Sequence, residues 1–329
     1  MYYNFYVVRA SYLETIIKAL DNLNADTDLL LKNVGLSRSH IDNLDHLILE
    51  YPAWALLESS AEALKLPNLG KIIGQQFCQT FFNSTKDLNK KFPTIESVLH
   101  YFMDEDSVLT NTPSFWLKED ENYIWLCRLG TPGINIGVWQ MEQYVVCFLV
   151  ELLKIFLGEN WSPQCIKLKT DGKDNPNDIF SFAQCDYELN NKFTAIAIEK
   201  RYISTVYANS IASKAAEPSQ RIPKAANVLI EKLLTQDYFG ENPTAEFIAN
   251  CFMINLRKLQ RTLNDCGTDL STLLEQNKKN KARKLLTRTD NSVTQIATKL
   301  GYTDNANFSR AFKRWFNLPP LKYRKQHTN

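Results

Sequence analysis

Histidine is scarce in this 329-residue sequence, and its placement argues against a metal enzyme. The four histidines (His40, His46, His100 and His327) show no metal-ligand spacing with Cys, Asp or Glu. Glycine-rich phosphate loops and the Gly-x-Ser-x-Gly elbow of hydrolases are also missing. The acidic stretch DGKDNPND at 171–178 lacks the register and terminal Glu of a calcium loop. We therefore expect no metal, no cofactor and no catalytic site.

Long apolar runs are missing as well. The most apolar stretch, from Tyr144 to Leu157, is interrupted by Glu151 and Lys154, and it is shorter than the roughly 20 residues that a bilayer requires. The N-terminus shows no signal-peptide pattern, and the seven cysteines are an odd number without paired spacing. We expect reduced thiols, a cytoplasmic location and no membrane partner.

Charge is distributed unevenly along the chain, although the whole sequence carries only +2. Residues 221–329 hold 19 Lys and Arg against 9 Asp and Glu, a net charge of +10, whereas residues 1–220 hold 19 against 27, a net charge of −8. A strongly basic third is typical of a module that binds nucleic acid. A charge run alone can also be a solvated face, so sequence motifs are needed to distinguish a nucleic-acid-binding module from a solvated surface.

The basic third has a helical pattern throughout. Residues 222–235 place apolar side chains at helical spacing behind a proline, and residues 270–287 form a longer helix of the same kind. Shorter helices are marked by caps and stops: Thr244, Asn255, Ser292 with Gln295, Gly301, and Pro319 with Pro320. A short helix, a tight turn and a second helix with a cationic outer face thus occur twice. This pattern predicts an all-α domain with two helix-turn-helix units joined by a long helix.

The long helix sets the separation of the two units. About 18 residues at about 1.5 Å each give a length of roughly 27 Å. That approaches the roughly 34 Å between successive major-groove faces on one side of B-DNA. One chain could therefore fill two consecutive major grooves.

Four stretches of the C-terminal third carry a specific resemblance. They are QRTL at 260–263, ARKLL at 282–286, IATKLGYTDNANFSRAFKRWF at 296–316 and PPLKYR at 319–324. These motifs resemble the DNA-binding domain of the AraC/XylS family of bacterial transcription regulators over the last hundred or so residues. The resemblance implies binding to double-stranded promoter DNA and contact with RNA polymerase.

The resemblance and the side-chain chemistry together nominate residues for DNA contact. Arg can donate two hydrogen bonds to guanine and Asn or Gln can pair with adenine, whereas cations at phosphate position the protein without specifying sequence. The base-reading candidates are Asn305, Ala306, Asn307, Ser309 and Arg310 in the second unit, with Leu256, Arg257, Gln260 and Arg261 in the first. The phosphate candidates are Lys258, Lys313, Arg314, Tyr323 and Arg324. For any one of these, a solvated helix face is the alternative.

Two positions depart from the family pattern. Met253 stands where the family usually has glycine in the first unit's turn, and a left-handed backbone there costs on the order of 1 kcal/mol or more for a residue with a side chain. Asn317 replaces the glycine usual before the final loop, and asparagine tolerates that conformation. The geometry of the second unit is therefore the better supported by the sequence.

The first two-thirds of the chain mixes helical and extended patterns. Helices fit 12–23, 54–66, 95–103 and 141–157; strands fit 114–117, 123–129, 165–169, 180–187 and 193–197. We interpret residues 1–208 as an α+β effector-binding or dimerisation domain. Small and polar residues then predict a linker at 209–221, followed by the DNA-binding domain at 222–329.

The α+β domain is open to more than one role. FSFAQCDYELNNKF near 180 and LPNLGKIIGQQF near 66 resemble the N-terminal effector domain of one AraC branch, called arabinose-binding-like, which implies an unknown small-molecule effector or dimerisation. Arg128 could hold a carboxylate ligand or form an ordinary salt bridge, and Trp116 and Trp125 could line a pocket or the core.

Three functional hypotheses follow from these patterns. The first is a transcription regulator controlled by a small molecule bound in the N-terminal domain. The second is a regulator whose N-terminal domain is a ligand-free dimerisation or protein-interaction module, with the helix at 141–157 packing on a partner copy or on its own sheet. The third, an enzyme with an appended DNA-binding domain, has no motif to support it.

Overall fold

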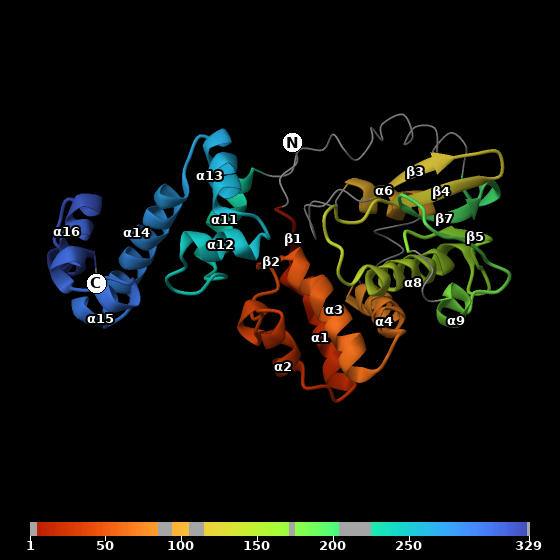
Figure 1. Cartoon of the computed structure of the whole chain (residues 1–329), viewed down its shortest axis with the longest axis horizontal. Coiled ribbons are helices and arrows are strands. Elements are labelled where there is room, and N and C mark those ends of the chain that lie inside the picture. Colours follow the sequence, from red (N-terminus) through yellow and green to blue (C-terminus); the bar gives the residue numbers. More distant parts are fainter. Residues whose placement is uncertain (1–4, 85–93, 105–114, 171–174, 204–224, 328–329) are drawn as a thin grey trace. The chain divides into compact units, whose positions relative to one another are not determined.

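The structure is a computed structural model that describes residues 5–84, 94–104, 115–170, 175–203 and 225–327 (Figure 1). The chain forms two compact units, Tyr6–Ile222 and Pro223–Asn329, and the second unit includes the first five residues. The predicted linker at 209–221 lies outside the described residues, as do residues 171–174 of the acidic stretch.

The N-terminal unit combines helices with a mixed sheet, as the sequence predicts. Its helices are α1 (Ala10–Asn22), α2 (Thr27–Asn33), α3 (Glu50–Leu64), α4 (Leu69–Ser84), α6 (Ile95–Asp104), α8 (Val138–Leu157) and α9 (Pro176–Phe180). Its strands are β1 (Val7–Arg9), β2 (Leu47–Leu49), β3 (Phe115–Glu119), β4 (Tyr123–Arg128), β5 (Cys165–Lys167), β6 (Asp186–Glu188) and β7 (Thr194–Glu199). Short 3₁₀ turns occur at Arg38–His40 and Lys200–Tyr202.

The main sheet has five strands in the order β3-β4-β7-β5-β6, and β1 pairs with β2 in a separate ribbon. All neighbours in the main sheet are antiparallel except β5 and β6, which run parallel. The strand predicted at 180–187 is wrong over most of its length. Phe180 ends α9, and only Asp186–Glu188 pairs in the sheet.

Helix α4, which the sequence did not predict, packs closely against α8. Gly70 and Gly74 explain how the two helices approach each other, because a Cβ on Gly70 would lie 2.0 Å from the backbone oxygen of Gln140. The same atom on Gly74 would lie 2.3 Å from the backbone oxygen of Tyr144. The side chain of Gln140 also accepts a hydrogen bond from the Gly70 amide at 2.8 Å. Any larger side chain at either glycine would push the helices apart.

The C-terminal unit is helical over its described residues. It contains α11 (Ala226–Thr235), α12 (Ala245–Cys251), α13 (Leu256–Asp265), α14 (Leu270–Arg288), α15 (Val293–Lys299), α16 (Asn305–Phe316) and α17 (Pro320–His327). Figure 1 shows α14 running from the group α11–α13 to the group α15–α16. The predicted helices at 222–235 and 270–287 correspond to α11 and α14.

The helix starts in this unit follow the predicted caps. Thr244, Asn255 and Ser292 each accept a hydrogen bond from a backbone amide three residues on, and Ser292 and Gln295 form the predicted capping box. Such caps satisfy amides that the first helical turn leaves unpaired. Phe247, in the first turn of α12, is 49% exposed, and Thr262 of α13 is fully buried.

Candidate nucleic-acid interface

Helix α16 has an apolar rear face and a polar outer face. Phe308 and Phe312 are fully buried in a core that α14, α15 and α17 complete with Ala282, Leu286 and Tyr323 among others. Asn305, Ala306, Asn307 and Arg310 are exposed, and Ser309 is half-buried. All five base-reading candidates of this helix therefore lie on its solvent side or at its edge.

A hydrogen-bonded chain orders the outer face of α16. Asp304, the N-cap, accepts from the backbone amide of Asn307 at 2.6 Å and from its side-chain nitrogen. The side-chain oxygen of Asn307 accepts in turn from Nη2 of Arg310 at 2.5 Å. Because the capped helix start fixes Asn307 and Asn307 holds Arg310, the guanidinium loses fewer degrees of freedom when it meets a base. The sequence prediction missed this role of Asp304.

Helix α13 presents a second cationic face. Arg257, Gln260 and Arg261 are exposed, whereas Leu256 is half-buried at the first turn. Leu259 and Leu263 are fully buried behind them. The structure thus brings Arg257, Gln260 and Arg261 together on one exposed face, with Leu256 at its margin.

The turns that precede α13 and α16 have the same backbone geometry. Met253 has φ +55° and Gly301 has φ +76°, both in the left-handed region. Around Met253 the amides of residues 253 and 254 donate to the carbonyls of residues 250 and 249; around Gly301 the amides of residues 301 and 302 donate to the carbonyls of residues 298 and 297. Met253 therefore adopts the conformation that glycine favours, with its side chain 57% exposed, and the turn keeps its form despite the conformational cost.

Helix α14 connects the two helix pairs. Its 19 residues correspond to a length of about 28 Å. Glu275 of α14 accepts from the indole nitrogen of Trp315 at 2.8 Å and forms an ion pair with Arg314, so it ties α16 to α14. The Trp315 N–H and the Arg314 guanidinium hold the pKa of Glu275 below its usual value. The sequence prediction also missed Glu275, because its partners lie 39 and 40 residues away.

The phosphate candidates separate into two groups. Lys313 is exposed and Lys258 is half-buried, so both can reach a phosphate. Arg314 is engaged by Glu275, and Arg324 donates to the backbone oxygens of residues 286 and 291 at 3.0 and 2.6 Å. Tyr323 is only 9% exposed and packs on Phe312 and Phe316. These contacts tie Tyr323 and Arg324 to groups inside the domain.

The effector candidates do not share one site. In β4, Trp125 and Cys127 lie on one face of the sheet, in a cluster that Trp116 joins from β3. Arg128 lies on the other face, because successive residues of a strand point to opposite sides. Its pairing partner on β7, Thr194, donates to Glu142 of α8 at 2.6 Å. Trp116 and Trp125 therefore lie on the opposite face of the sheet from Arg128.

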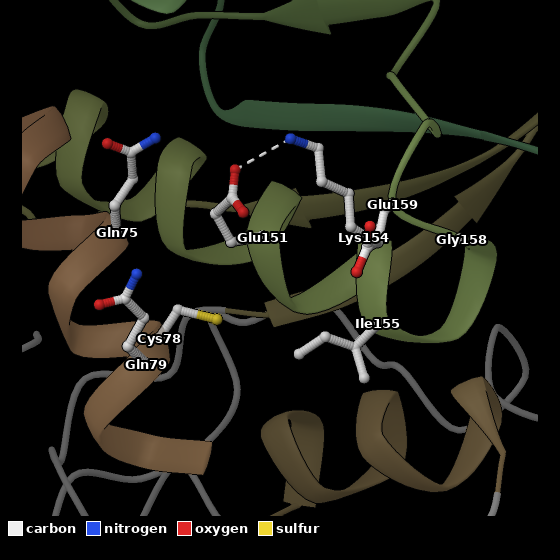
Figure 2. A pocket seen from close by; sticks show the side chains of 8 residues that line it. All are labelled: Gln75, Cys78, Gln79, Glu151, Lys154, Ile155, Gly158 and Glu159. Carbon is white, nitrogen blue, oxygen red and sulfur yellow. Dashed lines mark hydrogen bonds and ion pairs between the residues drawn. The ribbon is translucent and has the colours of Figure 1, made fainter. Parts of the chain in front are cut away.

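The N-terminal unit also has an open pocket of about 870 Å³ between α4 and α8 (Figure 2). It is lined by Gln75, Cys78, Gln79, Glu151, Lys154, Ile155, Gly158 and Glu159. Lys154 and Glu151, one turn apart on α8, form an ion pair at 3.0 Å on one side of the pocket. Burial raises the pKa of Cys78 to about 12, so the thiol stays protonated and is a poor nucleophile near neutral pH.

The described part of the chain offers neither a metal site nor a membrane span. Among these residues, no group of three or more His, Cys, Asp or Glu side chains could hold a metal ion. None of the helices that the structure describes is long and apolar enough to cross a membrane.

A short helix, a left-handed turn and an exposed cationic helix define the helix-turn-helix class of domain. The family described as a helix-turn-helix domain matches residues 248–326. The HTH-type transcriptional activator RhaS of Enterobacter sp. is 38% identical over 90 residues, which are 27% of this chain and 32% of that protein. An uncharacterized HTH-type transcriptional regulator of Mycobacterium tuberculosis is 34% identical over 100 residues, 30% of this chain and 29% of that protein. The C-terminal unit is therefore a helix-turn-helix domain of the AraC type, which confirms the resemblance seen in the motifs.

Similar solved structures carry related titles at low TM-scores. The transcriptional regulator CdpR from Pseudomonas aeruginosa is 16% identical, with 80% of this chain and 91% of that chain covered and a TM-score of 0.34. A transcriptional regulator with an AraC-type DNA-binding domain from Chromobacterium violaceum is 28% identical. The match covers 31% of this chain and 88% of that chain, with a TM-score of 0.26. The matches to RhaS and to the Mycobacterium tuberculosis regulator span about a third of the length of these two curated relatives.

Proposed function

We propose that this chain is a sequence-specific DNA-binding transcription regulator whose C-terminal unit reads two adjacent major grooves of promoter DNA. The outer face of α16 carries the proposal, because Asn307 and Arg310 are exposed, ordered by Asp304 and backed by buried phenylalanines. Their amide and guanidinium groups match the base edges of adenine and guanine. Helix α13 supplies the second reading face, and α14 separates the two readers by about 28 Å.

The contacts inside the domain refine which side chains serve which role. The base-reading set stays as predicted from the sequence, with Leu256 limited to apolar contact because it has no polar group. Lys258 and Lys313 remain phosphate contacts. Arg314 holds α16 on α14 through Glu275, and because its side chain is 69% exposed, its other N–H groups can still donate to a phosphate.

The N-terminal unit would control this activity through a small molecule. The alternative is a ligand-free dimerisation or protein-interaction module. Arg128 is a buried cation with an unpartnered nitrogen, which favours a binding role. RNA polymerase and a second copy of the chain stay in the proposal as partners on the strength of the family resemblance alone.

The direct test is selection of binding sites from random duplex DNA with the full chain, followed by affinity measurements with Arg310→Ala. If Arg310 contacts guanine, the variant should lose about 1 to 3 kcal/mol on the selected site and relax one base preference. Lys313→Ala should instead weaken all sequences alike and reduce the salt dependence. Arg288→Ala, an exposed change of equal charge on α14, is the control. Unchanged affinity and base preference in Arg310→Ala would remove α16 as the reader.

A further inference from the structure

Arg128 is a buried cation without an anionic partner among the described residues. Its side chain is 7% exposed, its Nη1 atom is buried without a hydrogen-bond partner, and it forms no ion pair within the described part of the chain. A guanidinium stays charged at every physiological pH. Burying such a charge without a direct anionic partner is unfavourable, so an anion that reaches Nη1 would be stabilised there even with the buried carboxylates Glu50 and Glu142 in the same region.

The nearby carboxylates are already engaged by other donors. Glu50 accepts from the hydroxyl of Thr131 at 2.6 Å and from the indole nitrogen of Trp54 at 3.3 Å. Glu142 accepts from the hydroxyl of Thr194 at 2.6 Å. Both carboxylates are buried, and neither forms an ion pair with Arg128. Glu50 and Glu142 therefore accept hydrogen bonds from hydroxyl and indole groups. Nη1 of Arg128 has no hydrogen-bond partner among the described residues.

A second cation lies beside the first. A Cβ on Gly130 would be 3.3 Å from Nζ of Lys169 and 3.5 Å from Nη1 of Arg128, so both groups flank the same backbone position. Lys169 uses one N–H for the backbone oxygen of Leu129 at 2.9 Å, which leaves two. Burial lowers the pKa of Lys169, Glu142 opposes this effect, and Arg128 lowers the pKa further. An anion at this position would relieve the repulsion between the two cations.

The surroundings of Arg128 are aromatic. Its Cζ lies 6.0 Å from the centre of the Trp54 ring, which is itself buried. Burial raises the pKa of Tyr144, and the charge of Arg128 acts against that rise. An anion held by Arg128 would therefore lie beside the ring of Trp54. This arrangement suits a small organic carboxylate with an apolar body, because Arg binds a carboxylate with two parallel hydrogen bonds.

We infer that Arg128 and Lys169 form the anion-binding end of an effector site, beside Trp54 of α3, that takes a small organic carboxylate. The inference rests on the proposed control by a small molecule and names the chemical class of that molecule. It leaves Trp116 and Trp125 out of the site, because the two tryptophans lie on the opposite face of the sheet.

The test is a thermal melt of the full chain with acetate, octanoate and benzoate, each compared with its uncharged amide at equal ionic strength. At about 100 times its Kd, a binding carboxylate should raise Tm by about 5 to 10 °C, and the amide should not. In Arg128→Met this response should disappear, while Arg201→Met, an exposed control, should keep it. The same response in wild type and Arg128→Met, or no response of the wild type to any of the three acids, would overturn the inference.

The stability of Arg128→Met without ligand separates a binding role from a structural one. Because the unpaired charge is removed and the apolar volume is kept, the variant should be as stable as the wild type or more stable in carboxylate-free buffer. A loss of stability, or failure to fold, would instead assign Arg128 a structural role. DNA affinity is measured separately with Arg310→Ala, so a failed carboxylate test leaves the DNA-binding proposal standing.

Discussion

Replacing Gly301 with alanine tests the turn that positions the reading helix α16. Gly301 has φ +76°, and an added Cβ would lie 2.7 Å from Oδ1 of Asn242. Asn242 donates from its side-chain nitrogen to the backbone oxygen of Lys299 at 3.1 Å. The substitution therefore places a side chain in a left-handed backbone and displaces a hydrogen-bonded amide.

The two costs can be separated. A left-handed alanine costs about 1 to 2 kcal/mol, offset by about 0.4 to 1 kcal/mol from the reduced freedom of the unfolded chain. Displacing Asn242 removes a hydrogen bond worth about 0.5 to 1.5 kcal/mol. The net loss should be about 1 to 2 kcal/mol. Gly267 supplies the control, because it has φ +75° and nothing within 4 Å of an added Cβ.

Hydrogen exchange of the amides of α15 and α16 in the full chain measures the effect locally. A loss of about 1 to 2 kcal/mol should accelerate exchange by about 5- to 30-fold, and Gly301→Ala should cost more than Gly267→Ala costs in its own turn. In the double variant Asn242→Ala with Gly301→Ala, the two losses should not add, because both remove the same contact. Equal costs at Gly301 and Gly267, or strict additivity, would refute the role of Asn242.

Two further predictions concern the groups that order α16. Asp304→Ala should destabilise the helix start by about 0.5 to 2 kcal/mol and relax the base preference at Arg310, measured by competition binding; Asp269→Ala, which removes the cap of α14, should lose stability without that change in preference. Glu275→Gln should destabilise the unit slightly at neutral pH, since exposed ion pairs contribute at most about 1 kcal/mol. Because the folded-state pKa of Glu275 is lowered, its contribution is complete above the unfolded value of about 4.3 and is lost as the pH falls through the folded value. Denaturation at pH 7 and pH 3 should therefore show a larger difference between the variant and the wild type at pH 7, and a difference that does not shrink in acid would contradict this account.

The sequence predicted the C-terminal unit well because its signals are local. Caps, turn residues and apolar spacing all act within a few positions, so Thr244, Asn255 and Ser292 could be placed correctly. Met253 shows the limit of a propensity argument, since a hydrogen-bonded turn holds it in a backbone conformation that a residue with a side chain disfavours. Glu275 could not be found, because its contact with Trp315 depends on how α14 and α16 pack.

The N-terminal unit was less predictable for physical reasons that differ by element. Helix α4 was missed because Gly70 and Gly74 weaken a helical pattern in the sequence. In the structure, both glycines lie against the backbone of α8, where a Cβ would clash. The separation of Trp125 from Arg128, by contrast, is predictable from the strand pattern alone. Residues three apart on one strand face opposite sides of a sheet, whatever the topology of that sheet.

The central claim is that two reading helices, joined by α14, meet successive major grooves on one side of the duplex. Hydroxyl-radical footprinting of the full chain on a selected site tests it most directly. The account predicts two protected patches on the same face, with centres about 10 base pairs apart. A single patch, or two patches on opposite faces of the DNA, would contradict it.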